Sequence, residues 1–443
     1  MSNAIYDCVD KYKVYVTCIE PMHTGCTGDK GEVLIHPVDQ TPFVQATSIC
    51  GVLRSYCNKI AKESVVEQLF GGTTDNLESK IKFSDGKFDE ESKLQLELRP
   101  KIQLDNAFGT MSSSEVKGTN EIKSGHKFDM QYVGAGAKFS FEIYIYGGTA
   151  EDKKLIETGL AALHAQEIQF GGQKSNGCGY VKINKLLHKH YDMTNPTERK
   201  QWINEEGLTS IEILKLDVVN HVNKYRVEIL AETESELLIK GIVVEKFGKE
   251  EPKDMNIKNA EGRYIIPGSS FKGSIRNRME MIADYMSLNP SIIYDSFGKA
   301  VETSEDGFRG NLYFRDIIVG EENKHNLRTR IRIDKFTGGV MNGGLFSQLN
   351  IYGDMTIAVH LLDDKNPDAV LGLFLLAIRD LAHKMYAIGS GQNVGKGYLT
   401  IKEIKIVDLK ENTSCSLDST FQVSGDSKIV NQCLVALKNQ QVA

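Results

Sequence analysis

The 443-residue sequence has no long apolar run, no paired cysteines and only 9 prolines. No stretch reaches the roughly 18 consecutive apolar residues that a membrane-spanning helix needs, so we expect no membrane partner. The first residues, MSNAIYDCVDKYK, lack the basic-then-apolar layout of a signal peptide. The eight cysteines form no CxxC pair and no regular framework, which is typical of reduced thiols. We therefore expect a cytoplasmic, globular protein.

An excess of positive charge is also lacking. The formal net charge is −6, which argues against a protein that coats nucleic acid over its whole surface. A basic groove on an acidic body stays compatible with this charge, because phosphate contacts need local rather than net positive charge. The ten histidines show no metal-ligand spacing. The length is sufficient for two ordinary domains.

Four blocks of the sequence recur in the same order, at offsets between 218 and 229 positions. The clearest pairs FVQATSICGVLRSYC at 43–57 with IIPGSSFKGSIRNRM at 265–279, which places Ser48 on Ser270. Chance is a poor explanation for four ordered matches, so we predict two homologous domains, residues 1–206 and 207–443. The other block pairs are 69–72 with 296–299, 99–110 with 328–339, and 170–183 with 388–401.

Each copy shows the same order of expected elements. A strand comes first, then a helix capped by Ser48 or Ser270, a long insertion, a second strand, a second helix and a last strand after a glycine loop. This order is typical of an α+β fold with ferredoxin-like (RRM-type) domains, each carrying an inserted segment. We expect a connecting helix within 192–222 and a peripheral tail after residue 410. The expected strands are 12–20, 138–147, 225–232 and 349–362, the helices are 150–166 and 366–386, and the insertions are 71–135 and 298–345.

The block IPGSSFKGSIR predicts a phosphate site. Small residues precede a helix whose first turns carry Lys272 and Arg276, and free N–H groups at a helix start attract anions. Ser269 and Ser270 would belong to this site. In the first copy Arg54 is kept and Cys50 replaces the lysine, so the site there should be weaker. A capped helix with solvated cations is the alternative interpretation.

Two further groups of residues are candidate RNA contacts. The glycine loops bring Lys174, Gln392 and Lys396 to a place where the backbone can approach a flat ligand, although a tight turn explains the glycines equally well. A P-loop is excluded, because Gly397 follows Lys396 where Ser or Thr is required. Arg328, Arg330 and Arg332 alternate along an expected strand and would share one face, either along a phosphate backbone or as an edge-strand charge ladder.

Together the IPGSSFKGSIR block, the D-x-x-[TG]-G block and the glycine loop near each domain end resemble the RAMP superfamily. The sequence is most similar to backbone subunits of type III CRISPR effector complexes, here as a tandem double copy. The resemblance implies a ferredoxin-like palm and a β-hairpin thumb in each copy, the thumbs coming from the two insertions. It also implies that the partners are guide (CRISPR) RNA, target RNA, neighbouring RAMP proteins and the large subunit of the complex.

The resemblance further implies an endoribonuclease activity on target RNA. An acidic residue shortly before the helix block supports this cleavage with a divalent metal, expected to be Mg²⁺. In the second copy this residue is Asp254, and in the first copy Asp29 is nearest, with Glu32 and Asp39 as alternatives. Both aspartates are expected to be catalytic and to hold the metal while the ribose 2′-OH attacks the phosphodiester.

Three other functions stay open. The chain could be a non-catalytic guide-RNA-binding scaffold, in which neither carboxylate acts. It could also be a guide-RNA-processing endoribonuclease that uses a histidine pair, for which His23 and His36 are available. A metabolic enzyme on a doubled ferredoxin-like fold is disfavoured, because no cofactor motif survives inspection.

Overall fold

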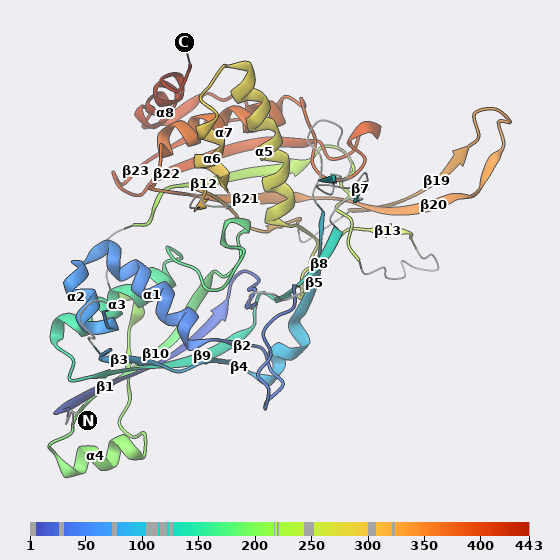
Figure 1. Ribbon diagram of the computed structural model, residues 1–443. Helices are drawn as coiled ribbons and strands as arrows, with labels where there is room; N and C mark the ends of the chain where they lie inside the picture. The colour runs from blue at the N-terminus through green and yellow to red at the C-terminus, as the bar shows by residue number, and fades with distance from the viewer. Residues whose placement is uncertain are drawn as a thin grey trace. The chain divides into compact units, whose positions relative to one another are not determined.

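The computed structural model divides the chain into two compact units, which are described separately (Figure 1). Unit 1 comprises residues 1–97, 131–174 and 178–222, and unit 2 comprises 98–130, 175–177 and 223–443. The predicted division between residues 206 and 207 stays a prediction. The structure describes residues 6–25, 31–72, 78–102, 114–115, 122–123, 127–216, 218, 221–242, 252–299, 307–320 and 324–442.

The main sheet of unit 1 has the strand order β11-β10-β1-β9-β4-β2, with β3 also paired to β9. The central strand β1 runs antiparallel to both β9 and β10. Alternating residues of β1 are fully buried, as the sequence pattern predicts for a half-buried strand. The strands are β1 (Cys8–Cys18), β2 (Phe43–Val44), β3 (Ile81–Phe83), β4 (Gly86–Phe88), β9 (Lys138–Tyr146), β10 (Val181–Asp192) and β11 (Thr209–Ile211).

Three helices, α1 (Ala46–Ile60), α2 (Glu63–Phe70) and α3 (Ala150–His164), cover one face of this sheet (Figure 1). A capping box starts α3, in which Thr149 and Asp152 satisfy each other's backbone N–H groups. The expected connecting helix is α4 (Pro196–Ile203), which lies on the other face. Its Trp202 ring packs edge-on against Tyr144 of β9 and Tyr191 of β10.

Unit 2 repeats this arrangement with the strand order β17-β21-β12-β22-β23-β24. Strand β12 is central and antiparallel to β21 and β22, as β1 is to β9 and β10. The helices lie on one face (Figure 1). They are α5 (Gly268–Tyr285), α6 (Ser291–Phe297), α7 (Pro367–Ala382) and α8 (Lys428–Lys438), and the strands are β12 (Asn223–Thr233), β17 (Leu312–Phe314), β21 (Asp354–Leu362), β22 (Leu399–Asp408), β23 (Thr413–Asp418) and β24 (Val423–Gly425).

The prediction of a peripheral tail after residue 410 is wrong. The tail adds β23 to the edge of the sheet and packs α8 on α7, where Ile429, Cys433 and Leu437 are buried in the core of unit 2. The approach of the helices is close, because a Cβ atom at Gly372 of α7 would lie 2.6 Å from the carbonyl oxygen of Cys433. The tail looks polar because each of its elements is short and buries only one face.

The insertions form smaller sheets. In unit 2, β19 (Lys324–Ile333) and β20 (Val340–Tyr352) make a long hairpin to which β13 (Asp254–Met255) is added. In the first half of the sequence, β5 (Leu96–Ile102) pairs with β8 (Lys127–Val133). The remaining pairs are β6 (Ser114–Glu115) with β7 (Ile122–Lys123), β14 (Ile265–Ile266) with β18 (Ile317–Ile318), and β15 (Gly298–Lys299) with β16 (Phe308–Arg309).

Helices and antiparallel sheets in each unit confirm the predicted α+β class. Among the described residues, no helix is long and apolar enough to cross a membrane. The cysteines that the structure describes are free thiols.

The serines of the repeated block do not cap their helices. Helices α1 and α5 begin two residues earlier than Ser48 and Ser270, after Gln45 and Pro267. A distant carboxylate instead accepts the first helical N–H in each copy: Asp85 Oδ1 from Ala46 at 2.7 Å and Asp316 Oδ1 from Gly268 at 2.9 Å. Both aspartates lie at least 39 residues beyond the helix start, so local spacing could not reveal them.

The glycine loops owe their repeated G-x-G-Y ending to close backbone approach. A Cβ atom at Gly179 would lie 1.9 Å from the carbonyl oxygen of Phe170, and one at Gly397 would lie 1.9 Å from that of Ile388. Both glycines also have positive φ, +87° and +83°. Only glycine fits such a position, so this turn explains the motif without a ligand.

We expect Gly397→Ala to lower the free energy of unfolding by about 3 kcal/mol, because it combines left-handed backbone strain with a steric clash. Gly395→Ala is the matched control: Gly395 has φ +82° and open space around its Cβ position. That variant should cost only about 1 kcal/mol. Urea denaturation followed by circular dichroism measures both, and equal costs would contradict the steric explanation.

Candidate nucleic-acid interface and carboxylate site

Asp254 lies on β13, directly opposite Gln348 of β20 in a parallel pairing. The Gln348 Nε2 atom donates a hydrogen bond to Asp254 Oδ2 at 2.8 Å, and the Lys240 Nζ atom lies 3.0 Å from the same oxygen. The Asp254 side chain is nevertheless 19% exposed. The carboxylate is therefore fixed from one side and open to a ligand from the other.

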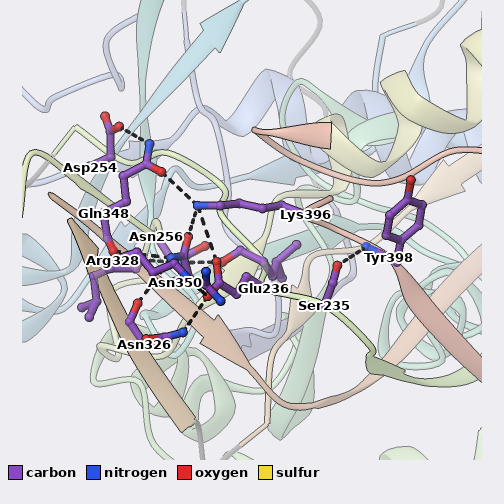
Figure 2. A network of polar contacts seen from close by, with 12 residues as sticks. Ser235, Glu236, Asp254, Asn256, Asn326, Arg328, Gln348, Asn350, Lys396 and Tyr398 are labelled. Carbon is purple, nitrogen blue, oxygen red and sulfur yellow. Dashed lines mark hydrogen bonds and ion pairs between the residues drawn. The ribbon is translucent and has the colours of Figure 1, made fainter. Parts of the chain in front are cut away.

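A buried lysine lies behind this pair. Lys396 is only 2% exposed, and its ammonium donates to Gln348 Oε1 at 2.9 Å and to Asn350 Oδ1 at 2.6 Å (Figure 2). Because the Gln348 oxygen is engaged by an obligate donor, its amide nitrogen must face Asp254. Lys396 thus fixes the orientation of Gln348, and Gln348 fixes the carboxylate.

Glu236 balances the buried ammonium. It is 7% exposed and its Oε2 atom lies 3.8 Å from Lys396 Nζ. Its Oε1 atom accepts hydrogen bonds from Asn326 Nδ2 at 2.6 Å and from Arg328 Nε, both on β19 (Figure 2). Burial lowers the pKa of Lys396, as does nearby Arg330, while Glu236 raises it.

Asn256 closes the network on the backbone side. Its side chain donates to the carbonyl oxygens of Leu237 and Leu349 at 3.1 and 3.0 Å, and accepts from the Ile239 N–H at 2.7 Å. These bonds join β13 and β20 to the segment that carries Glu236. The result is a network of polar side chains that supports the carboxylate from beneath. The donors and acceptors of the network satisfy one another's hydrogen bonds.

The described residues of the first copy do not repeat this network. Hydrogen bonds from Gly179 to Pro21 and from Gly397 to Glu236 are equivalent, as are the bridges Met22–Val133 and Leu237–Ile351. At four positions of the network this register assigns an apolar or weakly polar residue to the first copy. Pro21 replaces Glu236, Met130 replaces Gln348, Tyr132 replaces Asn350 and Cys178 replaces Lys396.

Three acidic residues, Asp29, Glu32 and Asp39, are candidates for the first-copy counterpart of Asp254. Asp29 lies outside the described residues. Counting back from the helix block with its own offset of 222 positions (270 − 48) places Glu32 on Asp254, next to Gly31, whose carbonyl accepts from the Gln131 N–H at 2.7 Å. Asp39 is 43% exposed and lies near His36 and Lys87. The repeat offset was the signal in the sequence that favours Glu32.

The start of helix α5 gathers cations within unit 2. Lys272 Nζ donates to Ser175 Oγ at 2.8 Å, and Lys101 Nζ donates to Ser269 Oγ at 2.9 Å. Burial, together with nearby Arg276 and Lys101, lowers the pKa of Lys272 to about 8. A pKa depressed by neighbouring cations indicates that an anion would be stabilised here.

The other predicted RNA contacts lie in four places. Ser270 is exposed in the first turn of α5, and Arg276 pairs with Glu280 at 2.8 Å. Arg54 donates to the Gly71 carbonyl at 2.9 Å, where it closes the end of α2. Lys396, which was predicted to contact RNA, lies inside the protein, where the turn directs its ammonium to Gln348 and Asn350. Gln392 is exposed in the short helix Gln392–Val394, and Lys174 begins the short helix Lys174–Asn176.

Arg330 and Arg332 lie on the hairpin β19–β20, which the D-x-x-[TG]-G block closes. Asp334 accepts the N–H groups of Phe336 and Thr337 at 2.9 and 2.8 Å, and these bonds lower its pKa. The ring of Phe336 is 99% exposed at the tip. The block is thus a turn motif that leaves an aromatic ring exposed at the tip of the hairpin.

A divalent metal fits this site only with ligands from the substrate. In the described part of the chain, no group of three His, Cys, Asp or Glu residues is placed to hold a metal. Mg²⁺ is commonly held by one or two carboxylates together with substrate phosphates, so Asp254 is compatible as a single protein ligand.

Of the two histidines considered for processing, His23 is 9% exposed and its Nδ1 atom lies 2.9 Å from the Gln131 carbonyl oxygen.

Residues 15–182 and 230–400 match the family model described as the RAMP superfamily. The two matched stretches coincide with the two repeats. No curated protein matches the chain.

We expect Lys396→Met to lower the free energy of unfolding by about 2–3 kcal/mol, because it leaves two buried amide oxygens unsatisfied. Gln348→Met removes one of those oxygens and imitates Met130 of the first copy. The double variant should therefore cost less than the sum of the single variants by about 1 kcal/mol or more. Urea denaturation of the four proteins measures this coupling, and additive costs would show that the network does not exist.

Proposed function

Because the chain belongs to the RAMP superfamily of CRISPR-associated RNA-binding proteins, we propose that it is a guide-RNA-binding backbone subunit of a type III effector complex that also cleaves complementary target RNA. The Asp254 carboxylate, fixed by Gln348 and open to solvent, is the observation that carries the cleavage proposal. The complex would be cytoplasmic. Its other members would be neighbouring RAMP proteins and the large subunit.

The guide RNA would bind along unit 2 from the start of α5 to the β19–β20 hairpin. Lys272 and Lys101 would contact its phosphates, and Arg330 and Arg332 would follow the backbone along the hairpin. Phe336 at the tip would separate stacked bases of the guide–target duplex. Unstacking turns a nucleotide outward, which an in-line attack requires.

In the proposed cleavage, the 2′-oxygen of target RNA forms a bond to the adjacent phosphorus, and the bond from phosphorus to the 5′-oxygen of the next nucleotide breaks. The proton leaves the 2′-hydroxyl towards Asp254, and the leaving oxygen gains one from water. A bound Mg²⁺, held by Asp254 and by phosphate oxygens, would stabilise the developing negative charge. Gln348 and Lys240 keep the carboxylate oriented.

The second copy would be the active one. Of the two copies, only this one has the polar network of Lys396, Glu236 and Gln348 beneath the carboxylate. In the first copy, activity would depend on Asp29 or on Glu32, without that support. The processing alternative is weakened at His23, which is nearly buried and has its Nδ1 atom at a backbone carbonyl oxygen, whereas His36 is 25% exposed beside Asp39.

We expect Asp254→Ala to abolish one set of target-RNA products in the reconstituted guide-bound complex, while Asp29→Ala or Glu32→Gln removes at most another set. EDTA should stop all cleavage if Mg²⁺ takes part. Asp354→Ala removes a carboxylate that is 76% exposed, and as the surface control it should leave the products unchanged. Unchanged cleavage by Asp254→Ala, with intact guide binding, would leave the chain as a non-catalytic scaffold.

Gln348→Glu tests the orienting contact separately. It keeps the shape of the side chain but replaces the donor to Asp254 by a second negative charge, which should repel the carboxylate and slow cleavage at least about tenfold. Guide-RNA affinity should stay within about twofold, because Gln348 lies beneath the proposed surface. Single-turnover rates and a filter-binding titration measure the two effects. A loss of binding equal to the loss of rate would indicate general unfolding instead.

We also expect guide-RNA affinity to fall up to about tenfold between pH 7 and pH 9. The pKa of free Lys272 is about 8, and a bound phosphate raises it. Binding therefore takes up a proton above pH 8 and weakens as the pH rises. Lys272→Arg keeps the charge over this range, so its affinity should change much less. A wild-type affinity independent of pH would exclude Lys272 from the interface.

A further inference from the structure

The outer face of the unit 1 sheet, opposite helices α1–α3, carries lysines around one tyrosine. We define the lysine–tyrosine face as Lys13 and Tyr15 of β1, Lys138 of β9, and Lys182 and Lys185 of β10. Strand register places them together: Tyr15 is paired with Lys185, and Thr17 is paired with both Lys138 and Lys182. Helix α4 packs farther along the same face, at Tyr144 and Tyr191.

The cations of this face border the aromatic ring. The Lys185 and Lys13 ammonium groups lie 5.8 and 6.0 Å from the centre of the Tyr15 ring. Lys138, Lys182 and Lys185 are exposed, whereas Tyr15 is half-buried and so held in place by its neighbours. Glu142 is the acid paired opposite Lys13, and it is shared with Lys11, at 3.3 and 3.2 Å. The face therefore keeps an excess of positive charge in a chain whose net charge is −6.

The second copy provides an internal comparison. Hydrogen bonds from Cys18 to Ala137 and from Thr233 to Gly353 superpose the two sheets. Three lysines of unit 1 then coincide with acids of unit 2, and the tyrosine coincides with an aliphatic residue. Glu228 takes the place of Lys13, Leu230 that of Tyr15, Asp354 that of Lys138, Thr400 that of Lys182 and Glu403 that of Lys185.

At three of these five positions the two copies carry opposite charge, so the fold itself does not require these lysines. Fold stability gives no reason to cluster exposed lysines, because like charges repel. A sheet face with an aromatic ring and flanking cations is suited to single-stranded RNA, whose bases stack on the ring and whose phosphates meet the cations. An acidic protein surface would explain the lysines but not the tyrosine.

We propose that the lysine–tyrosine face of unit 1 is a second RNA-binding surface, which holds a single strand by stacking one base on Tyr15. It uses none of the guide-binding residues of unit 2 and does not depend on cleavage. Its ligand would be RNA outside the guide–target duplex, because a base must be unpaired and turned outward to stack on a side chain.

Binding of a labelled oligouridine to the full chain, followed by fluorescence anisotropy, tests the proposal. Lys182→Glu/Lys185→Glu should weaken binding by about tenfold or more and reduce the slope of log affinity against log salt by about 1.4, the value for two lost phosphate contacts on a single strand. Lys402→Glu/Lys405→Glu makes the same charge change on β22 of unit 2 and is the matched control. If both double variants weaken RNA binding equally, the loss reflects only the net charge of the protein, and the proposal is overturned.

Tyr15 tests the stacking step. Tyr15→Ala should weaken oligouridine binding about five- to 100-fold, whereas Tyr15→Phe keeps the ring and should bind like wild type. The fluorescence of Trp202, the single tryptophan, reports whether unit 1 stays folded in each variant. Unchanged binding by a folded Tyr15→Ala protein would contradict the proposal and leave an acidic protein as the partner of this face.

Photocrosslinking with 4-thiouridine RNA separates this proposal from the guide-RNA proposal. Adducts in peptides from β1 or β10 would support the lysine–tyrosine face, and adducts at α5 or the β19–β20 hairpin would support the guide site. Crosslinks confined to unit 2 would overturn the second surface while leaving the guide-binding proposal intact.

Discussion

The burial of one ammonium group organises the polar side of unit 2. Lys396 is almost inaccessible to water, so each of its donors needs an acceptor inside the protein. Gln348, Asn350 and Glu236 supply these acceptors, and the three come from the hairpin and from the segment that follows β12. The glycine loop, the hairpin β19–β20 and the end of β12 are thereby joined at one point. The orientation of Asp254 depends on this buried charge, because Lys396 fixes Gln348 and Gln348 fixes the carboxylate of Asp254.

The two copies of the fold fill the same buried positions with different kinds of side chain, polar in the second copy and mostly apolar in the first. In the first copy the corresponding positions are Pro21, Met130, Tyr132 and Cys178, which need few hydrogen bonds. Replacing a fully satisfied polar network by apolar side chains is often neutral or favourable for stability. The polar version in the second copy is therefore hard to explain by stability alone. It is easily explained if a carboxylate at this place must keep one orientation.

Much of the fold could be predicted from the sequence, because its signals are local or periodic. Alternating residues located β1, β9 and β12, and the repeat located the same elements in the second copy. The tail after residue 410 was misjudged, because short elements with one buried face resemble polar loops. Asp85 and Asp316 were missed as helix caps, because they act across 39 and 48 residues of sequence. The division at residue 206 stays a prediction.

The candidate site shows the same limit more sharply. The family resemblance implied Asp254, and the helix block indicated Lys272 and Arg276. No single motif pointed to Gln348, and Lys396 was assigned to RNA binding although it is buried. Comparing the copies position by position would have helped in both cases. A lysine whose counterpart is Cys178 and a glutamine whose counterpart is Met130 occupy positions that are apolar in the other copy. Two polar residues placed where the fold tolerates apolar ones must satisfy each other, and that requirement is enough to identify them as a pair from their positions in the repeat.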